Sequence, residues 1–289
     1  DRSTHTVVVP LRDMLSHAFT PALNSTSIPK LFQNGLYDTL YFLRWNVQCE
    51  NWMYDIQHLT HSWHSELPKR LDFITAFAVR EVRYWKDDSA GSEYNKFEYN
   101  ARDCWATMMT WLSLSLEVPQ WAWENYYQEF PMVFPCLHIE ADGLSLNKAR
   151  IDRNRAAAEA KLKQAADKLE AWIGKGFNPN SPVQMKKLLK VLGCGNVDSA
   201  DAKALNAAAA ASPFNTLVLS EVLAYRKQAK LLSTYFVWEK FWNGRLFYKS
   251  NPAGTDTGRL ASTESSFWTG LQIQNVPQGT AVKDWVECD

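Results

Sequence analysis

The residues from Gly254 to Ser262 are of types that can hold a nucleic-acid strand. Thr255 and Thr257 carry short hydroxyls that can donate to phosphate oxygens. Gly258 has no Cβ, so a bound strand can come close to the backbone at that point. Arg259 presents a rigid fork of donors, and the minor groove of DNA shows acceptors on every correct base pair. The segment therefore has donors that suit the phosphates and base edges of a nucleic acid.

This segment and a second block, Gln274–Pro277, resemble the T-x-T-G-R-L-S-S and Q-N-I-P blocks of family A DNA polymerases. A glycine-rich string alone is more simply a turn before a surface loop, but two blocks in the right order favour the resemblance. It implies a position at the start of the palm, against the minor groove at the primer end. The chain departs from the pattern between Ser262 and Leu271, where it is longer, as in some phage-like members, and Gln272 replaces the usual Asn. The DNA-binding residues that the resemblance implies are Thr255, Thr257, Arg259, Gln274 and Asn275.

Two pairs of residues nearer the beginning of the chain have the spacing of a nuclease site. Asn34 and Asp38 are four residues apart, as are Tyr99 and Asp103, and this spacing predicts one helical face for each pair. The two segments resemble the second and third exonuclease motifs of the family's proofreading domains. The resemblance implies a catalytic set in which Asp38 and Asp103 hold Mg²⁺ or Mn²⁺, because two-metal cleavage needs carboxylates around its cations. Tyr99 would orient the attacking water, and Asn34 would complete the set. In an arbitrary chain, a lone Y-x-x-x-D is more often a pair on a helix surface.

Parts of the family's pattern have no counterpart in this sequence. The first exonuclease motif, D-x-E, does not occur before Asn34. The segment from Val282 to Asp289 resembles the approach to the strand with the first polymerase aspartate, but no D-Y-S-Q-like motif follows. We therefore expect the chain to begin inside an exonuclease domain and to need another chain or segment, with the rest of the palm and the fingers, for catalysis.

Residues 147–238 predict three helices. Asn147 can cap a first helix over 147–173. Ser181 is the expected N-cap of a second, which stops at Gly193, and Gln184 is expected to complete a capping box with it. A third is expected over about 217–238.

These helices resemble the thumb of family A polymerases, through an F-N-x-x-S-x-x-Q-L-like block at Phe177 and a Y-R-x-x-x-K-L-x-S-T-Y-like block at Tyr225. Residues 148–192 hold eleven Lys or Arg and four Asp or Glu, although the net charge of the chain is zero. Such a basic block points to a groove for a polyanion, and the simpler alternative is a solvated helix face. The resemblance implies contacts to the duplex backbone, which position DNA without reading its sequence, by Asn178, Ser181, Arg226, Lys230 and Thr234.

The remaining composition bounds the class of protein. Five scattered cysteines without a C-x-x-C pair predict reduced thiols in a cytoplasmic protein, in the host cell if the protein is viral. No apolar run approaches the length of a membrane span. His58, His61 and His64 recur every three residues, which does not put all of them on one face. No further ligand completes a metal site, so we expect a polar helix face.

The patterns together predict a mainly α chain with α/β parts. We expect the C-terminal part of a ribonuclease H-like exonuclease domain over 1–118, a connector over 119–140 and a helical thumb over 141–244. The start of the palm, with its first strands and the minor-groove motif, is expected over 245–289. A strand-like run covers Thr6–Val9.

The leading hypothesis is a phage-type family A DNA polymerase, a nucleotidyltransferase of DNA replication with homology to a proofreading 3′–5′ exonuclease. The complete enzyme would bind primer-template DNA and dNTPs, and this chain alone is expected to be inactive. The alternative is a non-catalytic duplex-DNA-binding subunit or a fragment of a split polymerase. A weaker alternative is an exonuclease that takes its missing carboxylates from another chain.

Overall fold

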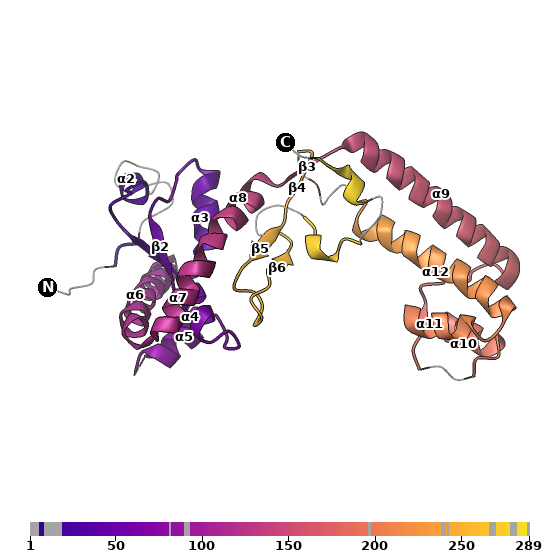
Figure 1. Cartoon of the computed structure of the whole chain (residues 1–289), viewed down its shortest axis with the longest axis horizontal. Coiled ribbons are helices and arrows are strands. Elements are labelled where there is room, and N and C mark those ends of the chain that lie inside the picture. The colour runs from indigo at the N-terminus through magenta and orange to yellow at the C-terminus, as the bar shows by residue number, and fades with distance from the viewer. Residues whose placement is uncertain are drawn as a thin grey trace. The chain divides into compact units, whose positions relative to one another are not determined.

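The computed structural model describes residues 6–8, 19–80, 82–89, 93–195, 198–237, 241, 243–265, 270–277 and 282–287. It is mainly helical with three small sheets (Figure 1). The chain divides into two compact units, one of residues 1–143 and 247–274 and the other of residues 144–246 and 275–289. None of the described helices is long and apolar enough to cross a membrane. Thr6–Val8 do not form the expected strand, and Val9 lies outside the described residues.

In the first unit, a short helix is followed by two short strands that pair in parallel, and each strand is followed by a helix. Phe32 lies opposite Asp55 at the ends of these strands. Further helices follow, and an antiparallel hairpin pairs Ser250 with Ser262. The elements of this unit are α2 (Thr20–Leu23), β1 (Lys30–Phe32), α3 (Gly35–Arg44), β2 (Trp52–Asp55), α4 (Ile56–Trp63), α5 (Leu71–Ala78), η1 (Lys86–Ser89), α6 (Glu93–Glu117), α7 (Gln120–Glu129), η2 (Phe130–Met132), α8 (Val133–Asp142), β5 (Lys249–Asn251) and β6 (Ala261–Thr263), with η4 (Ile273–Asn275) at its end.

Residues 119–140, which the sequence presented as a connector, instead supply much of the core of this unit. Tyr126 and Val133 are fully buried among side chains of α3, α4 and α6. The Tyr126 ring stacks on Phe130 with 4.8 Å between centroids, and its hydroxyl donates to the Met53 carbonyl at 3.0 Å. Aromatic side chains bury large apolar areas, so a segment rich in Trp, Tyr and Phe packs inside rather than linking domains.

The buried carboxylate of Asp55 joins the beginnings of α3 and α4. It is the N-cap of α4, where Oδ1 accepts from Gln57 N at 2.9 Å and from His58 N at 3.4 Å. The same side chain accepts from Asn34 N at 3.2 Å and from Gly35 N at 2.8 Å, at the start of α3. One side chain therefore satisfies amides that two helix N-termini would otherwise leave without partners.

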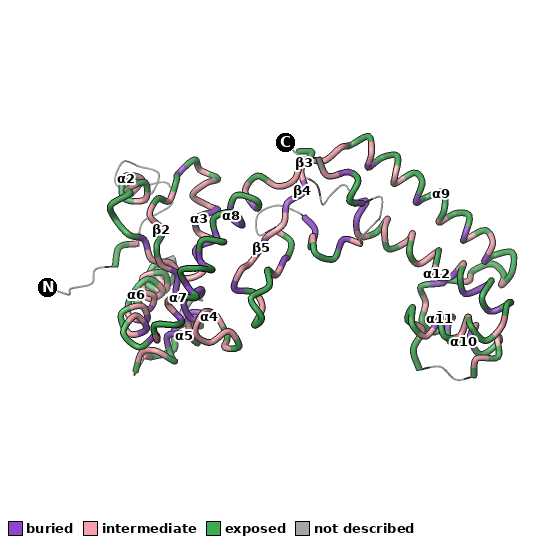
Figure 2. Tube along the Cα trace, viewed as in Figure 1, coloured by how far each residue is buried: buried purple, intermediate pink, exposed green. Residues whose placement is uncertain are grey.

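The second unit is built on two long helices, α9 (Lys148–Ile173) and α12 (Pro213–Thr234), which pack along each other (Figure 1). The buried residues of α9 are Ile151, Ala158, Ala165 and Leu169, a stripe narrow enough to leave most of the helix exposed (Figure 2). At the other end of the unit, β3 pairs with β4 and β7 in an antiparallel sheet. The remaining elements are β3 (Leu144–Leu146), α10 (Pro182–Val191), α11 (Ala202–Ala209), β4 (Arg245–Leu246), η5 (Lys283–Trp285) and β7 (Val286–Glu287).

The predicted caps of α9 and α10 are confirmed. The Asn147 side chain accepts from Arg150 N at 2.9 Å, and the Ser181 hydroxyl accepts from Gln184 N at 3.4 Å. The expected capping box is wrong in one detail, because Gln184 Oε1 accepts from Asn178 N at 2.6 Å instead of returning to Ser181. Gln184 thus holds the preceding turn against α10.

The third helix begins four residues earlier than predicted. Ser212 caps it, since its hydroxyl accepts from Asn215 N at 3.1 Å, and Pro213 occupies the first turn. This Ser-Pro pair is an N-terminal signal of the same kind as Ser181-Pro182, and the prediction overlooked it. The helix ends at Thr234 rather than at Trp238, which lies outside the described residues.

The prediction of a polar helix face for the histidines is wrong for two of the three. His58 and His61 are buried, at 4 and 6 % exposure, and His58 packs edge-on against Phe130 at 5.6 Å between ring centroids. Neither His58 Nε2 nor His61 Nδ1 has a hydrogen-bond partner among the described residues. All residues of α4 from Ile56 to His61 are buried, so both rings lie inside the unit.

We expect replacement of Asp55 by Ala to destabilise the first unit by about 2–4 kcal/mol. The change leaves buried amides of two helix N-termini without an acceptor, and each such loss costs about 1–3 kcal/mol. Asp55→Asn keeps the shape and one acceptor and should cost less. Urea unfolding followed by circular dichroism measures both variants. An Asp55→Ala protein as stable as the wild type would contradict the joining role of this carboxylate.

Protonation of His58 should lower the stability of the first unit as the pH falls. Burial lowers the pKa of His58, while the charge of Asp55 opposes this shift. The unfolded chain binds a proton near pH ~6.5, above the folded pKa. The stability present at neutral pH is therefore lost progressively as the pH falls below about 6.5.

Asp38 changes the stability in the opposite direction as the pH falls. Its folded pKa, about 6, lies above the unfolded value, so its protonation favours the folded state. The measurement is thus the difference between wild type and His58→Gln in the unfolding free energy from pH 8 to 5. This difference should shrink as the pH falls, and His64→Gln, a change of a partly exposed side chain, is the control. A difference that stays constant with pH would contradict the prediction.

Candidate nucleic-acid interface

Close packing and hydrogen bonds within the loop between β5 and β6 fix its conformation. A Cβ on Gly254 would lie 2.5 Å from the Ala261 Cβ, so only glycine lets the two arms of the hairpin come together. Gly258 has a positive φ of 72°, and its N–H donates to the Thr255 carbonyl at 3.2 Å. The Thr255 hydroxyl donates to the Arg259 carbonyl at 2.7 Å. The loop is therefore a defined turn.

The two blocks of the sequence signature meet through Gln274. Its side-chain Oε1 accepts from Ser262 N at 3.2 Å, and the Ser262 hydroxyl accepts from Gln274 N at 3.3 Å. The amide nitrogen of the Gln274 side chain donates to the Leu260 carbonyl. A DNA contact was predicted for Gln274, whereas its side chain is hydrogen-bonded within the loop.

The tip of the loop is open to solvent. Thr257, Gly258 and Arg259 are exposed, and Thr255 is half-buried. Within the described residues no hydrogen bond or ion pair engages the Arg259 guanidinium. Asn275, at the start of the second unit's last segment, is exposed, and its carbonyl accepts from the Tyr235 hydroxyl at 2.6 Å. Thr257 and Arg259 thus have polar groups available to a ligand.

A hollow of about 590 Å³ in the second unit is lined by two of the residues that the thumb resemblance implies, Arg226 and Lys230. It is lined by Lys186, Arg226 and Lys230 together with the acids Asp198 and Asp201. Pro182, in the first turn of α10, also lines it, and a helix N-terminus is a favourable place for a phosphate. This hollow can accept an anionic backbone on its lysine side.

The other predicted thumb contacts have partly structural roles. The Ser181 hydroxyl is the cap of α10. Asn178 is exposed, but its side-chain oxygen accepts from Asn180 N at 2.9 Å. Thr234 lies half-buried in the last turn of α12. Their contacts with DNA stay predictions.

Arg226 is committed to the protein itself. Its Nε donates to the Pro179 carbonyl at 2.7 Å, and one terminal nitrogen donates to the Ala200 carbonyl at 2.5 Å. Burial lowers the pKa of the guanidinium, which remains charged at neutral pH. Arg226, on α12, therefore holds the segments before and after α10. Lys230 lies one turn later on α12, and its side chain is exposed. The contact of Arg226 with phosphate stays a prediction, because two of its three nitrogens already donate to the protein.

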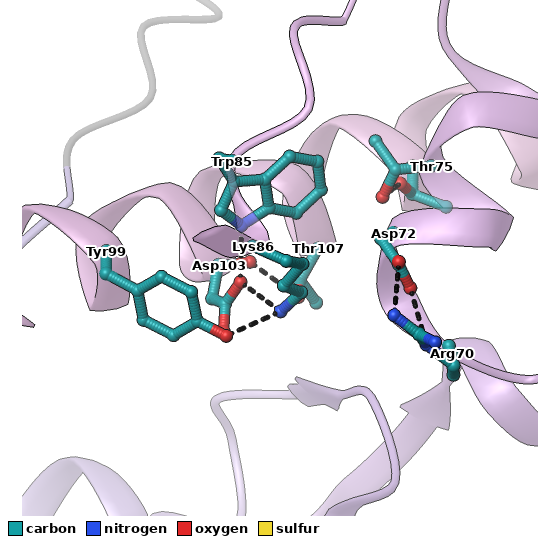
Figure 3. Close-up of polar contacts among 9 residues, drawn as sticks. Arg70, Asp72, Thr75, Trp85, Lys86, Tyr99, Asp103 and Thr107 are labelled. Carbon is teal, nitrogen blue, oxygen red and sulfur yellow. Dashed lines mark hydrogen bonds and ion pairs between the residues drawn. The ribbon is translucent and has the colours of Figure 1, made fainter. Parts of the chain in front are cut away.

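The exonuclease-like motif on α6 forms a cluster around a lysine that belongs to neither motif. Lys86 Nζ lies 2.6 Å from Asp103 Oδ1 and donates to the Tyr99 hydroxyl at 3.1 Å (Figure 3). The indole nitrogen of Trp85 donates to the same Asp103 oxygen at 2.6 Å. No spacing in the sequence relates Lys86 to α6, because it reaches the helix from the preceding η1 segment.

The second predicted carboxylate, Asp38, is half-buried on α3. Burial, and secondarily the charge of Asp55, raise its pKa to about 6. After burial itself, the charges of Asp103 and Asp38 both raise the pKa of the Cys104 thiol, so the two carboxylates share one neighbourhood. Asn34 is not on the helical face with Asp38, because it precedes α3 as a left-handed N-cap with φ of 61°.

These residues do not fit a divalent-metal site as they are placed. Asp103 Oδ1 already accepts from an ammonium and an indole N–H, and such cations need several free oxygen ligands. In the part of the chain that the structure describes, no group of three or more His, Cys, Asp or Glu could hold a metal ion. The nuclease roles of Asp38, Tyr99 and Asp103 stay predictions that require further ligands.

Comparison with known proteins places the chain beside bacterial DNA polymerases. No family model matches it. It is 29 % identical over 175 residues to the thermostable DNA polymerase I of Thermus thermophilus, an alignment that covers 55 % of this chain and 19 % of that protein. It is 26 % identical over 161 residues to DNA polymerase I of Streptococcus pneumoniae serotype 4, with 53 and 18 % covered. The chain is homologous to DNA polymerase I over about half of its length.

The fold agrees with this homology. The structure matches the POL domain of Pol1 from M. smegmatis in complex with DNA primer-template and dNTP, with a TM-score of 0.72 and 18 % identity. The match covers 92 % of this chain and 46 % of that chain. The mostly helical fold with small sheets is therefore that of a part of a polymerase domain. The chain spans about a fifth of the length of the curated relatives that it matches.

We expect Arg226→Ala to lower the stability of the second unit by about 1–3 kcal/mol, the cost of leaving buried carbonyls without a donor. Lys230→Ala, on the same face of α12, is the matched control and should change stability by less than about 0.5 kcal/mol. Thermal unfolding of the two variants compares them directly. Equal, small effects would show that the guanidinium is dispensable for the fold.

Proposed function

We propose that the chain is part of a family A DNA-directed DNA polymerase of the phage or viral type that acts in DNA replication. The observation that carries the proposal is the loop from Gly254 to Leu260. Glycine geometry and Gln274 fix this loop, and it leaves Arg259 exposed without a protein partner in the described residues. The homology to DNA polymerase I supports the assignment.

The proposed ligand is a primer-template duplex, with dNTPs as substrates of the complete enzyme. Arg259 would donate to minor-groove acceptors, with Thr257 directed to the backbone. In the second unit, Lys186 and Lys230 and the N-terminus of α10 would hold backbone phosphates. The polymerase metal ions, Mg²⁺ or Mn²⁺, would be bound by groups supplied by another segment or a second chain.

A non-catalytic duplex-binding subunit is the second candidate. It is favoured by the hollow of the second unit, where Lys186 and Lys230 would hold a duplex backbone with no need for catalytic carboxylates. The exonuclease-like part of the chain would then have a structural role. The two candidates differ in whether the protein that contains this chain incorporates nucleotides.

In the complete enzyme, Arg259→Ala should reduce incorporation at a matched primer end by an amount equal to one lost charged hydrogen bond, about 1.5–3 kcal/mol. The loss should shrink on primers that end in a 3-deaza purine, because the acceptor atom is already missing. Steady-state incorporation on natural and 3-deaza termini, by wild type and variant, gives a double-mutant cycle. Lys227→Ala, an exposed change on α12, is the control and should show no coupling.

Additive losses would show that Arg259 does not contact the minor groove. If the assembled protein binds duplex through Arg259 but incorporates no nucleotide, the non-catalytic candidate is correct. If the protein that contains this chain binds no duplex DNA, both proposed functions are wrong.

A further inference from the structure

The Lys86 ammonium occupies the position beside Asp103 where a cation would otherwise neutralise the carboxylate. It is only 19 % exposed, and its partner Asp103 is 29 % exposed. An ammonium has three donors and no acceptor. Two of them are used here, one on Asp103 Oδ1 and one on the Tyr99 hydroxyl. The positive charge of Lys86 therefore lies in direct contact with the carboxylate oxygen of Asp103.

Two aromatic rings hold this ammonium in place. Lys86 Nζ lies 5.0 Å from the centroid of the Tyr99 ring and 5.3 Å from that of the Trp85 ring. Both distances are within the range of cation–π attraction. The Trp85 indole also donates to Asp103 Oδ1 at 2.6 Å, so the same side chain fixes both members of the ion pair. In Figure 3 dashed lines join the ammonium to the Tyr99 hydroxyl and to the Asp103 carboxylate.

We propose that Lys86 is a built-in cation that takes the place of a divalent metal at Asp103. The ammonium and the indole both bond to Oδ1, which leaves that oxygen no role as a metal ligand. A divalent ion brought to this carboxylate would also face the ammonium charge at contact distance, and like charges repel strongly in a partly desolvated site. The site is thus an internal ion pair, and Tyr99 and Asp103 position Lys86 instead of a water and a metal.

This inference concerns only residues of the first unit and does not depend on DNA binding or polymerase activity. It predicts that removal of the ammonium, with the carboxylate retained, creates a cation site that the wild-type chain lacks. Tb³⁺ is a suitable probe, because it takes oxygen ligands as Ca²⁺ does and because a neighbouring indole sensitises its luminescence. Trp85, in contact with Asp103, is the built-in sensitiser.

The experiment titrates Tb³⁺ into the full 289-residue chain and records the emission that is lost in the matching Trp85→Phe protein. The wild type should show no emission that depends on Trp85. Lys86→Met should bind Tb³⁺ at least about tenfold more tightly, since removing ~1.4 kcal/mol of repulsion is a tenfold change. The gain should disappear in Lys86→Met/Asp103→Asn. Lys86→Arg keeps the charge and should show no gain.

Melting temperatures of all variants accompany the titrations. If Lys86→Met does not fold, Lys86→Gln is read by the same criteria, because it also removes the charge and keeps a polar end. Emission from the wild type that depends on both Trp85 and Asp103 would overturn the proposal. A folded, uncharged variant at position 86 with no gain in Tb³⁺ binding would overturn it as well.

Discussion

The first unit depends on one buried carboxylate. Asp55 ends the second of two parallel strands and accepts hydrogen bonds from backbone amides at the starts of α3 and α4. Its own N–H donates to the Tyr126 hydroxyl at 3.0 Å, which ties α7 to the same point. A carboxylate without exposure is tolerated only when its oxygens are satisfied, and here the helix N-termini meet that condition. The helix α3, which carries Asp38, begins at this junction.

Charged side chains in both units are engaged internally at places where the sequence suggested ligand contacts. Lys86 neutralises Asp103, and Arg226 donates to two backbone carbonyls. Half-buried cations of this kind need partners because desolvation is costly, and the nearest acceptors belong to the chain itself. Residues that stay exposed, such as Arg259 and Lys230, are therefore better candidates for DNA contacts than those already bonded.

In the loop from Gly254 to Leu260, different residues of one sequence signature have different roles. Gly254 and Gly258 permit the turn, and Ser262 and Gln274 lock it through reciprocal hydrogen bonds. Arg259 is left at the exposed tip. A motif residue can therefore matter by fixing the loop rather than by touching a ligand, and the identity of the residues alone does not separate the two roles.

The sequence by itself determined the features that depend on near neighbours. The caps at Asn147 and Ser181 were predictable, because a cap contacts amides only a few residues away. The order of the two polymerase-like blocks also predicted the homology. Only the tertiary structure decided that His58 is buried, that residues 119–140 form core and that Lys86 pairs with Asp103. These outcomes depend on which distant segments pack together, and no local spacing encodes that, since packing joins residues far apart in the chain.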